Sequence, residues 1–148
     1  MTSKILFALI YLVFALSTPA NSGNLWPPRN YDPGLVTEWN ALLVDALPPT
    51  LGADVARYYA LMHIAMYDAV SSIDGGDPIR AHVPAARHAS SDAAAAQAAH
   101  DVLAALLPAH RASFDAALSA RLASINPERA KAGARVGREV AKRVLKSA

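Results

Sequence analysis

Apolar residues recur every three or four positions along most of this chain, which is the period of an amphipathic helix. The first such segment follows Thr37, whose hydroxyl suits an N-cap, and stops before Pro48 and Pro49. Its apolar positions are Trp39, Leu42, Leu43 and Ala46. The pattern predicts a helix from Glu38 to Leu47.

The second segment is the strongest helix of the pattern, and it opens at Gly52 or Ala53 and runs to about Ser72. Its apolar residues form a wide stripe, which consists of Val55, Tyr58, Tyr59, Met62, Ala65, Met66, Ala69, Val70 and Ile73. A stripe of this width predicts burial on more than one side of the helix. The turn at 74–78 ends it, and 79–90 shows no period and is predicted to be a loop.

Three more helices follow. Ser90 or Ser91 caps the third, and Pro108 breaks the path before a fourth at about 109–124. Asn126 and a proline at the first helical position start a fifth helix, which extends to about residue 146. No segment alternates like a strand. The sequence therefore predicts an all-α fold, with four or five helices in a bundle-like packing.

Small residues are expected to set how closely these helices approach, because alanine favours helix but fills little core volume. Gly133 and Gly137 lie four apart in the fifth helix, so they share one face. They permit a close contact with another helix. The alternative is that they are glycines in a surface helix, which would cost about 1 kcal/mol each.

The N-terminus has the three-part pattern of a secretory signal. Lys4 precedes twelve unbroken apolar residues, 5–16, and small residues suited to cleavage after Ala20 or Ser22 follow. Twelve residues span only about 18 Å as a helix, short of the ~30 Å hydrocarbon core, so no stable membrane anchor is expected. We predict a signal peptide over 1–22, a Pro-rich irregular lead-in over 23–35, a helical domain over 36–148, and export to the periplasm or the extracellular space.

Composition excludes several classes of site. The chain has no cysteine, so thiol catalysis and thiolate metal sites are absent. Without Lys4 it has 13 basic and 12 acidic residues, and a net charge near +1 predicts no nucleic-acid partner. The exception is the last helix, where basic residues crowd. They indicate an anionic partner, a solvated face, or a helix that packs on a continuation of the chain.

Histidines provide the candidate chemistry. His63 lies on the second helix with Asp68 five residues later, so it is either a general base or a buried histidine bonded to a neighbouring helix. Five residues correspond to about 500° around the helix, so Asp68 does not stack on His63. The other histidines form no i, i+4 pair, which argues against a metal site.

Polar residues of the first two helices are predicted to form a structural cluster. Glu38 is positioned to pair with Arg57 or to bond to His63 if the two helices are antiparallel. A catalytic carboxylate pair is the alternative, but no second carboxylate has a supporting spacing. We therefore predict no catalytic, cofactor-binding or metal-binding residue, and a structural cluster of Glu38, Asn40, Arg57, His63 and Asp68.

Two segments resemble the N-terminal region of secreted vanadium-dependent haloperoxidase-like proteins, which belong to the type 2 phosphatidic acid phosphatase superfamily. They are Thr-Glu-Trp-Asn at 37–40 and Met-His-Ile-Ala-Met-Tyr-Asp-Ala-Val at 62–70. The Ile-Asp turn at 73–74 and the Ala-rich helix that ends near Leu106-Leu107-Pro108 add to the resemblance. The resemblance covers about 36–146. It implies an all-helical fold in which vanadate or phosphate binds inside a helical bundle. It also implies three motifs: Lys-x6-Arg-Pro, Pro-Ser-Gly-His and Ser-Arg-x5-His-x3-Asp.

This chain departs from those motifs. Lys131 and Arg138 have the first spacing, but Glu139 replaces the proline. Arg57 and His63 have the third spacing without its serine and aspartate, and Ser-Gly-His is absent from the sequence. No catalytic residue is therefore assigned by the resemblance.

The expectation is a scaffold segment, truncated before the catalytic motifs and inactive alone. It has no cofactor of its own, while the full-length family uses vanadate. Its partner would be a missing C-terminal helical half or a second copy in a homo-oligomer. The alternative is a stand-alone exported helical binding or interaction protein. A fragment should expose an unpartnered apolar face on the second and fifth helices, whereas a complete domain should not.

Overall fold

The part of the chain that the structure describes is a series of helices joined by loops. A computed structural model describes residues 32–48, 52, 54–85 and 87–148. Within these residues there are five α-helices and one 3-10 turn, and there is no strand. They are α2 (Gly34–Ala46), α3 (Asp54–Asp74), α4 (Ser91–Leu106), η1 (Pro108–His110), α5 (Arg111–Ala123) and α6 (Pro127–Lys146). The all-α prediction is confirmed.

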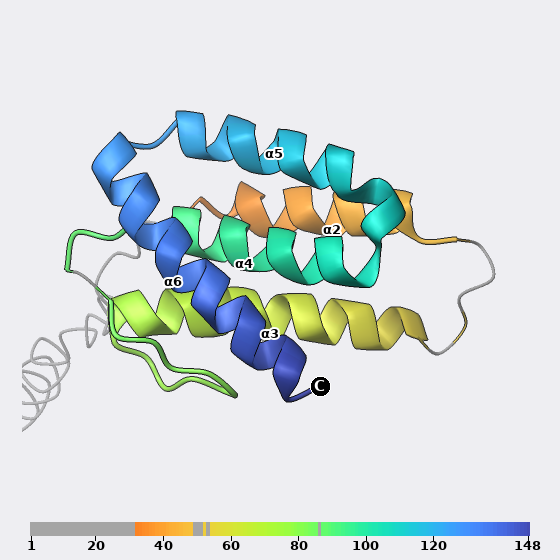
Figure 1. The fold of residues 1–148 in the computed structure, drawn as a ribbon, viewed down its shortest axis with the longest axis horizontal. Coiled ribbons are helices and arrows are strands. Elements are labelled where there is room, and N and C mark those ends of the chain that lie inside the picture. Colours follow the sequence, from red (N-terminus) through yellow and green to blue (C-terminus); the bar gives the residue numbers. More distant parts are fainter. Residues whose placement is uncertain (1–31, 49–51, 53, 86) are drawn as a thin grey trace, which may run out of the picture. The chain divides into compact units, whose positions relative to one another are not determined.

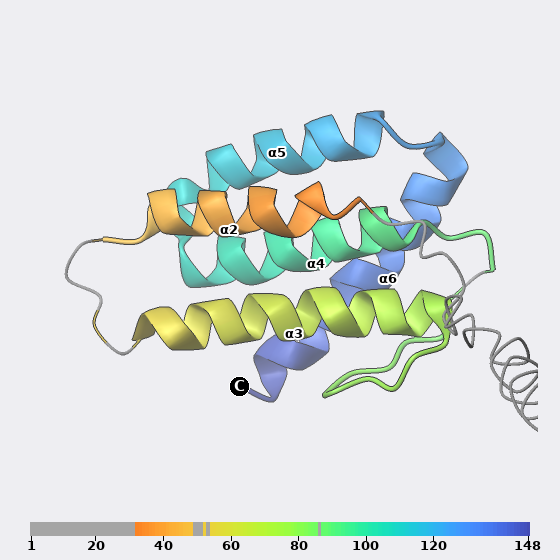
Figure 2. The ribbon, with the colours of Figure 1, turned by 180° about the vertical axis from the view of Figure 1, so that it is seen from behind.

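Four helices run in alternating directions, and α6 crosses them. In Figure 1, α2 and α4 run one way while α3 and α5 run the other. α6 passes obliquely over α4 and α3, and the view from behind in Figure 2 places α2 on the opposite side of α4 from α6. α4 contacts every other described helix, whereas α3 and α6 also contact each other.

The core is built around α4. Eleven of its residues are buried, seven of them alanines, and this composition lets neighbours approach it on all sides. The largest buried side chains come from other helices, and they include Trp39 of α2, Met62 of α3 and Phe114 of α5. The Trp39 and Phe114 rings lie 6.5 Å apart between centroids. α4 is thus more completely buried than α3, which the wide apolar stripe had singled out.

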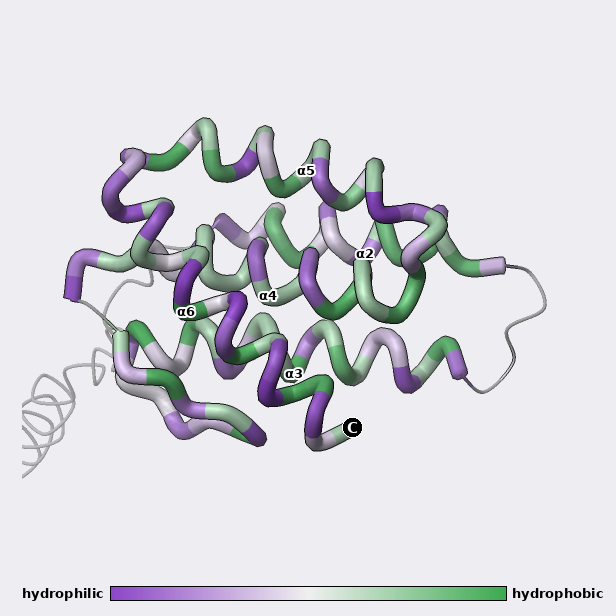
Figure 3. The backbone as a smooth tube through the Cα atoms, in the orientation of Figure 1, coloured by the Kyte–Doolittle hydropathy of each residue, from purple (hydrophilic) through white to green (hydrophobic). Residues whose placement is uncertain are grey.

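The glycines of α6 allow its close contact with α4. A Cβ added at Gly133 would meet the Ser90 carbonyl oxygen well under 3.0 Å, and one at Gly137 would meet the Ala94 carbonyl oxygen in the same way. The close-approach interpretation of these glycines is confirmed. Figure 3 shows that α6 is amphipathic, with hydrophobic and hydrophilic stretches alternating within its turns.

Most helix boundaries agree with the sequence pattern, and the differences lie near prolines. α6 begins at Pro127 with Asn126 as its N-cap, and α4 begins after Ser90, whose side chain accepts from the Ala93 N–H. α2 begins at Gly34, earlier than the predicted cap at Thr37, because Pro33 already has helical φ and ψ angles. The predicted lead-in is therefore wrong at residues 34 and 35.

Several predictions fall on other parts of the chain. The predicted signal peptide over 1–22 and residues 23–31 of the lead-in lie outside the described residues. Within the described ranges, none of the helices combines the length and the apolar character needed to cross a membrane.

Candidate functional site

One pair of the predicted polar cluster joins α2 to α3. His63 Nε2 lies 2.9 Å from Asn40 Oδ1, and the His63 ring stacks on Tyr59 with 6.2 Å between centroids. Because an amide oxygen only accepts, His63 donates from Nε2. Burial lowers the pKa of His63, which favours the neutral ring. This is the arrangement of a structural histidine that fixes the register of two helices.

Glu38 does not join that pair. Its Oε2 lies 2.5 Å from Nη2 of Arg121 on α5, and Nη1 of the same guanidinium lies 2.7 Å from Asp32 Oδ2. The hydrogen bond from Arg121 lowers the pKa of Asp32. The expected partners of Glu38, Arg57 or His63, were wrong: Arg57 is exposed on α3, and α5 supplies the cation.

A second carboxylate supports the same corner of the fold. Asp92, in the first turn of α4, accepts from the Asp32 N–H at 3.1 Å. Burial raises the pKa of Asp92, and the bond from Asp32 partly opposes this. The corner is thus an anchor that joins the start of α2 to α4 and α5.

Asp68 is fully buried and anchors a loop. Its two carboxylate oxygens accept from the backbone N–H groups of Ile79, Arg80 and Ala81 at 2.6, 2.9 and 2.8 Å. One turn along α3, the Ser72 hydroxyl accepts from the Val83 N–H at 3.1 Å. Both oxygens are therefore occupied by the protein itself, and Asp68 is neither a base for His63 nor a ligand site.

A buried histidine, His100, has two carboxylate partners. It was not among the candidate site residues predicted from the sequence. Its Nδ1 lies 2.7 Å from Asp101 Oδ1, and its Nε2 lies 2.6 Å from Asp115 Oδ1 on α5. The hydrogen bond that Asp101 accepts is the largest cause that raises the pKa of His100, against the opposing effect of burial. Gln97 donates to Asp101 at 2.8 Å.

This arrangement limits what His100 does chemically. Ionised carboxylates only accept, so the geometry suits an imidazolium that donates from both nitrogens, with no ring nitrogen left to take a substrate proton or to bind a metal. Its role is a charged link between α4 and α5. The contact of His100 with Asp101 could be expected because the two are neighbours in the sequence. The contact with Asp115 could not, because it forms only when α5 packs back against α4.

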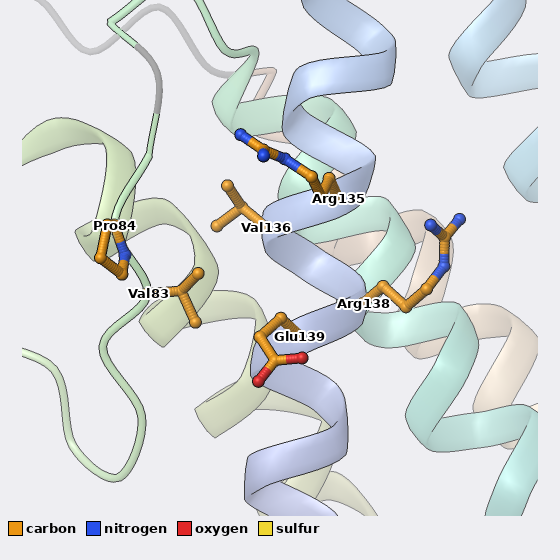
Figure 4. Close-up of a pocket in the computed structure, with 6 residues that line it drawn as sticks. All are labelled: Val83, Pro84, Arg135, Val136, Arg138 and Glu139. Carbon is orange, nitrogen blue, oxygen red and sulfur yellow. The ribbon is translucent and has the colours of Figure 1, made fainter.

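A shallow open pocket of about 300 Å³ lies between the 75–90 loop and α6. Figure 4 shows Val83 and Pro84 facing α6, with Arg135 and Glu139 extending toward opposite ends of the space beside Val136. Glu139 is 3.0 Å from Arg143 Nε, so it already has a cation. The pocket's lining contains no nucleophile or histidine. It is lined by Val83, Pro84, Arg135, Val136, Arg138 and Glu139.

The two partial matches to the oxyanion motifs do not come together. Lys131 and Arg138 are exposed on α6, whereas His63 is bonded to α2, and α2 lies on the opposite side of α4 from α6. Among the described side chains, no group of three or more His, Cys, Asp or Glu is placed to hold a metal ion. In comparisons with known proteins, no family model, no curated protein and no solved structure matches this chain.

Proposed function

We propose that this chain is the N-terminal helical scaffold segment of a secreted vanadium haloperoxidase-like or acid phosphatase-like protein, inactive by itself. One observation supports this most. In the 62–70 segment that resembles the family, Met62 and Met66 fill the core, His63 bonds to α2 and Asp68 anchors a loop. These polar groups of the segment maintain architecture, as a scaffold requires.

The arginine and the histidine that link α2 to its neighbours support the same proposal. A bound oxyanion needs several cationic and N–H donors that converge on one point. In the described residues, Arg121 is neutralised by two carboxylates and His63 donates to an amide. The backbone N–H groups of residues 79–81 converge on one point, but the buried Asp68 already occupies it with its own carboxylate. Vanadate would then be held by a part of the family's fold other than this one.

An activity assay tests the proposal directly. The chain is mixed with vanadate, peroxide and bromide, and bromination of a phenol dye is followed, with p-nitrophenyl phosphate hydrolysis measured in parallel. We expect neither signal above the protein-free blank, while a haloperoxidase run beside it brominates the dye. Turnover that scales with the concentration of this chain would overturn the proposal.

The gene provides a second test. An in-frame continuation beyond the codon for Ala148 that encodes Pro-Ser-Gly-His would support the scaffold role. A stop codon there would favour the alternative function.

That alternative is a stand-alone exported helical binding protein, and the outward side of α6 favours it. Most of its exposed positions are cationic rather than apolar, and the large exposed apolar residues of the described chain are scattered: Val44, Tyr67 and Ile79. A scaffold that lacks its partner should bind a hydrophobic dye such as ANS and self-associate. A monomer that does not increase ANS fluorescence would favour the alternative, a stand-alone binding protein.

Export belongs to both proposals and is tested separately. Expression in a bacterium with a Sec pathway should yield a chain whose first residue, by mass spectrometry, is Asn21 or Gly23. A cell-associated chain that keeps residues 1–20 would contradict the signal peptide.

A further inference from the structure

The charges of this chain are sorted between two parts of its fold. The formal net charge is only +2. The 75–90 loop and residues 127–148 nevertheless contain nine Lys and Arg against three Asp and Glu, a net charge of +6. The remaining described residues contain three Lys and Arg against nine Asp and Glu, a net charge of −6. A nearly neutral composition therefore conceals a strong electrostatic asymmetry.

The loop and α6 form one surface. Arg143 on α6 donates to the His82 carbonyl at 2.8 Å, and Arg80 in the loop donates to the Ser147 carbonyl at 3.1 Å. At the other end, Arg129 donates to the His88 carbonyl at 3.3 Å. The loop runs beside α6 in Figure 1. We call this surface the basic face; its cationic residues are Arg80, Arg87, Arg129, Lys131, Arg135, Arg138, Lys142, Arg143 and Lys146.

The centre of the basic face is a stripe along α6. Lys131, Arg135, Arg138 and Lys142 are spaced by four, three and four residues, so they share the outward side of the helix. All four are exposed, and among the described residues none of them forms an ion pair. Their positive charge is therefore available to something outside the molecule.

An apolar side chain stands beside the charges. Ile79 is 61% exposed, the most exposed large apolar residue of the described chain, and it directly precedes Arg80. Its backbone N–H is bonded to the buried Asp68 carboxylate, so the loop that presents it is fixed. Basic residues together with an exposed aliphatic residue are typical of surfaces that lie on lipid headgroups and insert an apolar anchor.

We propose that the basic face docks on a bilayer that contains anionic phospholipids, with Ile79 as the inserted side chain. Positive charges near an anionic bilayer each add to the attraction, and the attraction falls with ionic strength. A face formed by one helix and one loop, with long flexible Lys and Arg side chains, suits a laterally mobile layer of headgroups. This proposal does not depend on the scaffold role.

Two other occupants fit less well. A second copy of the chain would have to offer an equally concentrated acidic surface. Asp32 and Glu38 pair with Arg121, and Asp101 and Asp115 pair with His100. Outside the basic face, the other exposed carboxylates of the described chain are spread out, with Asp45 on α2 and Asp54 and Asp74 at opposite ends of α3. A nucleic acid is also attracted to positive charge. The net charge near +1 therefore no longer argues against a nucleic-acid partner, because the positive charges are concentrated on one face. The basic face, however, has no Phe, Tyr or Trp on which bases would stack.

Vesicle co-sedimentation tests the proposal, with phosphatidylcholine vesicles compared with vesicles that also contain phosphatidylglycerol. Because residues 5–16 are themselves apolar, binding is compared between variants that share this N-terminus. The double variant Arg135→Gln/Lys142→Gln removes two charges from the basic face. The matched control, Arg57→Gln/Arg111→Gln, removes two exposed charges elsewhere.

We expect the first variant to lose about tenfold or more in partitioning to the anionic vesicles at low salt, and the control to stay within about twofold. Ile79→Ser should weaken vesicle binding several-fold and leave retention on a cation-exchange resin unchanged. Circular dichroism of each variant shows whether it is folded. If Arg135→Gln/Lys142→Gln is unfolded, Arg138→Gln/Lys142→Gln takes its place.

Three results would overturn the proposal. Equal losses in both double variants would show that the position of the charge does not matter. Equal binding of the wild-type chain and the first variant to both kinds of vesicle would assign the contact to the N-terminus. Salt-sensitive dimerisation or oligonucleotide binding that the first variant abolishes, without vesicle binding, would assign the basic face to a second copy or to nucleic acid.

Discussion

At the scale of single residues, partners decide what each histidine does. His63 meets an amide and an aromatic ring, and burial lowers its pKa. His100 meets two carboxylates, and these raise its pKa although it is more deeply buried. Burial disfavours the charged imidazolium in both places, so the difference comes from the carboxylates. The two residues are therefore expected to respond differently to pH.

His100 should make stability depend on pH. Its pKa in the folded chain lies above the ordinary value of 6.5, so its stabilising effect is fully present below that pH and is lost as pH rises through the raised pKa. We expect His100→Gln to lower the free energy of unfolding by about 2 kcal/mol near about pH 6. The loss should shrink in alkaline solution. Urea unfolding across pH measures it.

The exposed His110 provides the matched control. His110→Gln should leave the free energy of unfolding unchanged within about 0.5 kcal/mol across the same pH range. A His100→Gln loss that is constant with pH would show that the imidazolium contributes packing rather than charge.

Asp68 should be the most sensitive polar residue of the chain. Asp68→Asn replaces one acceptor oxygen by an NH2 group that faces backbone N–H donors, so we expect a loss of about 2–4 kcal/mol in the free energy of unfolding. Hydrogen exchange should show lost protection at the Ile79 and Ala81 amides. Asp77→Asn, an exposed change in the same loop, should shift stability by no more than about 0.5 kcal/mol. Equal effects of the two would contradict the anchor.

At the scale of elements, the contact of α6 with α4 depends on the absence of side chains. Gly137→Ala should favour the isolated helix by about 1 kcal/mol. In the folded chain its Cβ would overlap the Ala94 carbonyl and approach the Gln97 Cβ. We expect overpacking to win, with a net loss of about 1–3 kcal/mol in the free energy of unfolding, measured by thermal or urea melts.

Gly52→Ala is the control, because a Cβ there meets nothing within 4 Å. It should be neutral or stabilise by up to about 1 kcal/mol. A stabilising Gly137→Ala would mean that α6 shifts along α4 without loss of contacts.

The sequence predicted the helices better than it predicted the contacts between them. The helices could be predicted because their apolar period, the Asn126-Pro127 start and the Ser90 cap are local features. The pairing of His100 with Asp115 could not, because it requires α5 to turn back at η1. For the same reason Glu38 was assigned a partner on the adjacent helix rather than Arg121, 83 residues away.

At the scale of the whole molecule, α4 makes the described helices one unit. It contacts α2, α3, α5 and α6, and eleven of its residues are buried. Loss of α4 would expose the buried faces of all four neighbours. The peripheral α2 and α5 also pack on each other through Trp39 and Phe114. Such an arrangement favours cooperative unfolding rather than stepwise loss of helices.

This predicts that two probes report one transition. Far-UV circular dichroism follows all helices, and Trp39 fluorescence follows the α2–α5 contact; Trp26→Phe removes the only other tryptophan. The two urea curves should have the same midpoint because α2 cannot leave without exposing the α4 core. Leu103→Ala, a fully buried change on α4, should shift both midpoints together through a loss of about 2–5 kcal/mol. An earlier fluorescence transition would show instead that α2 and α5 detach before α3, α4 and α6.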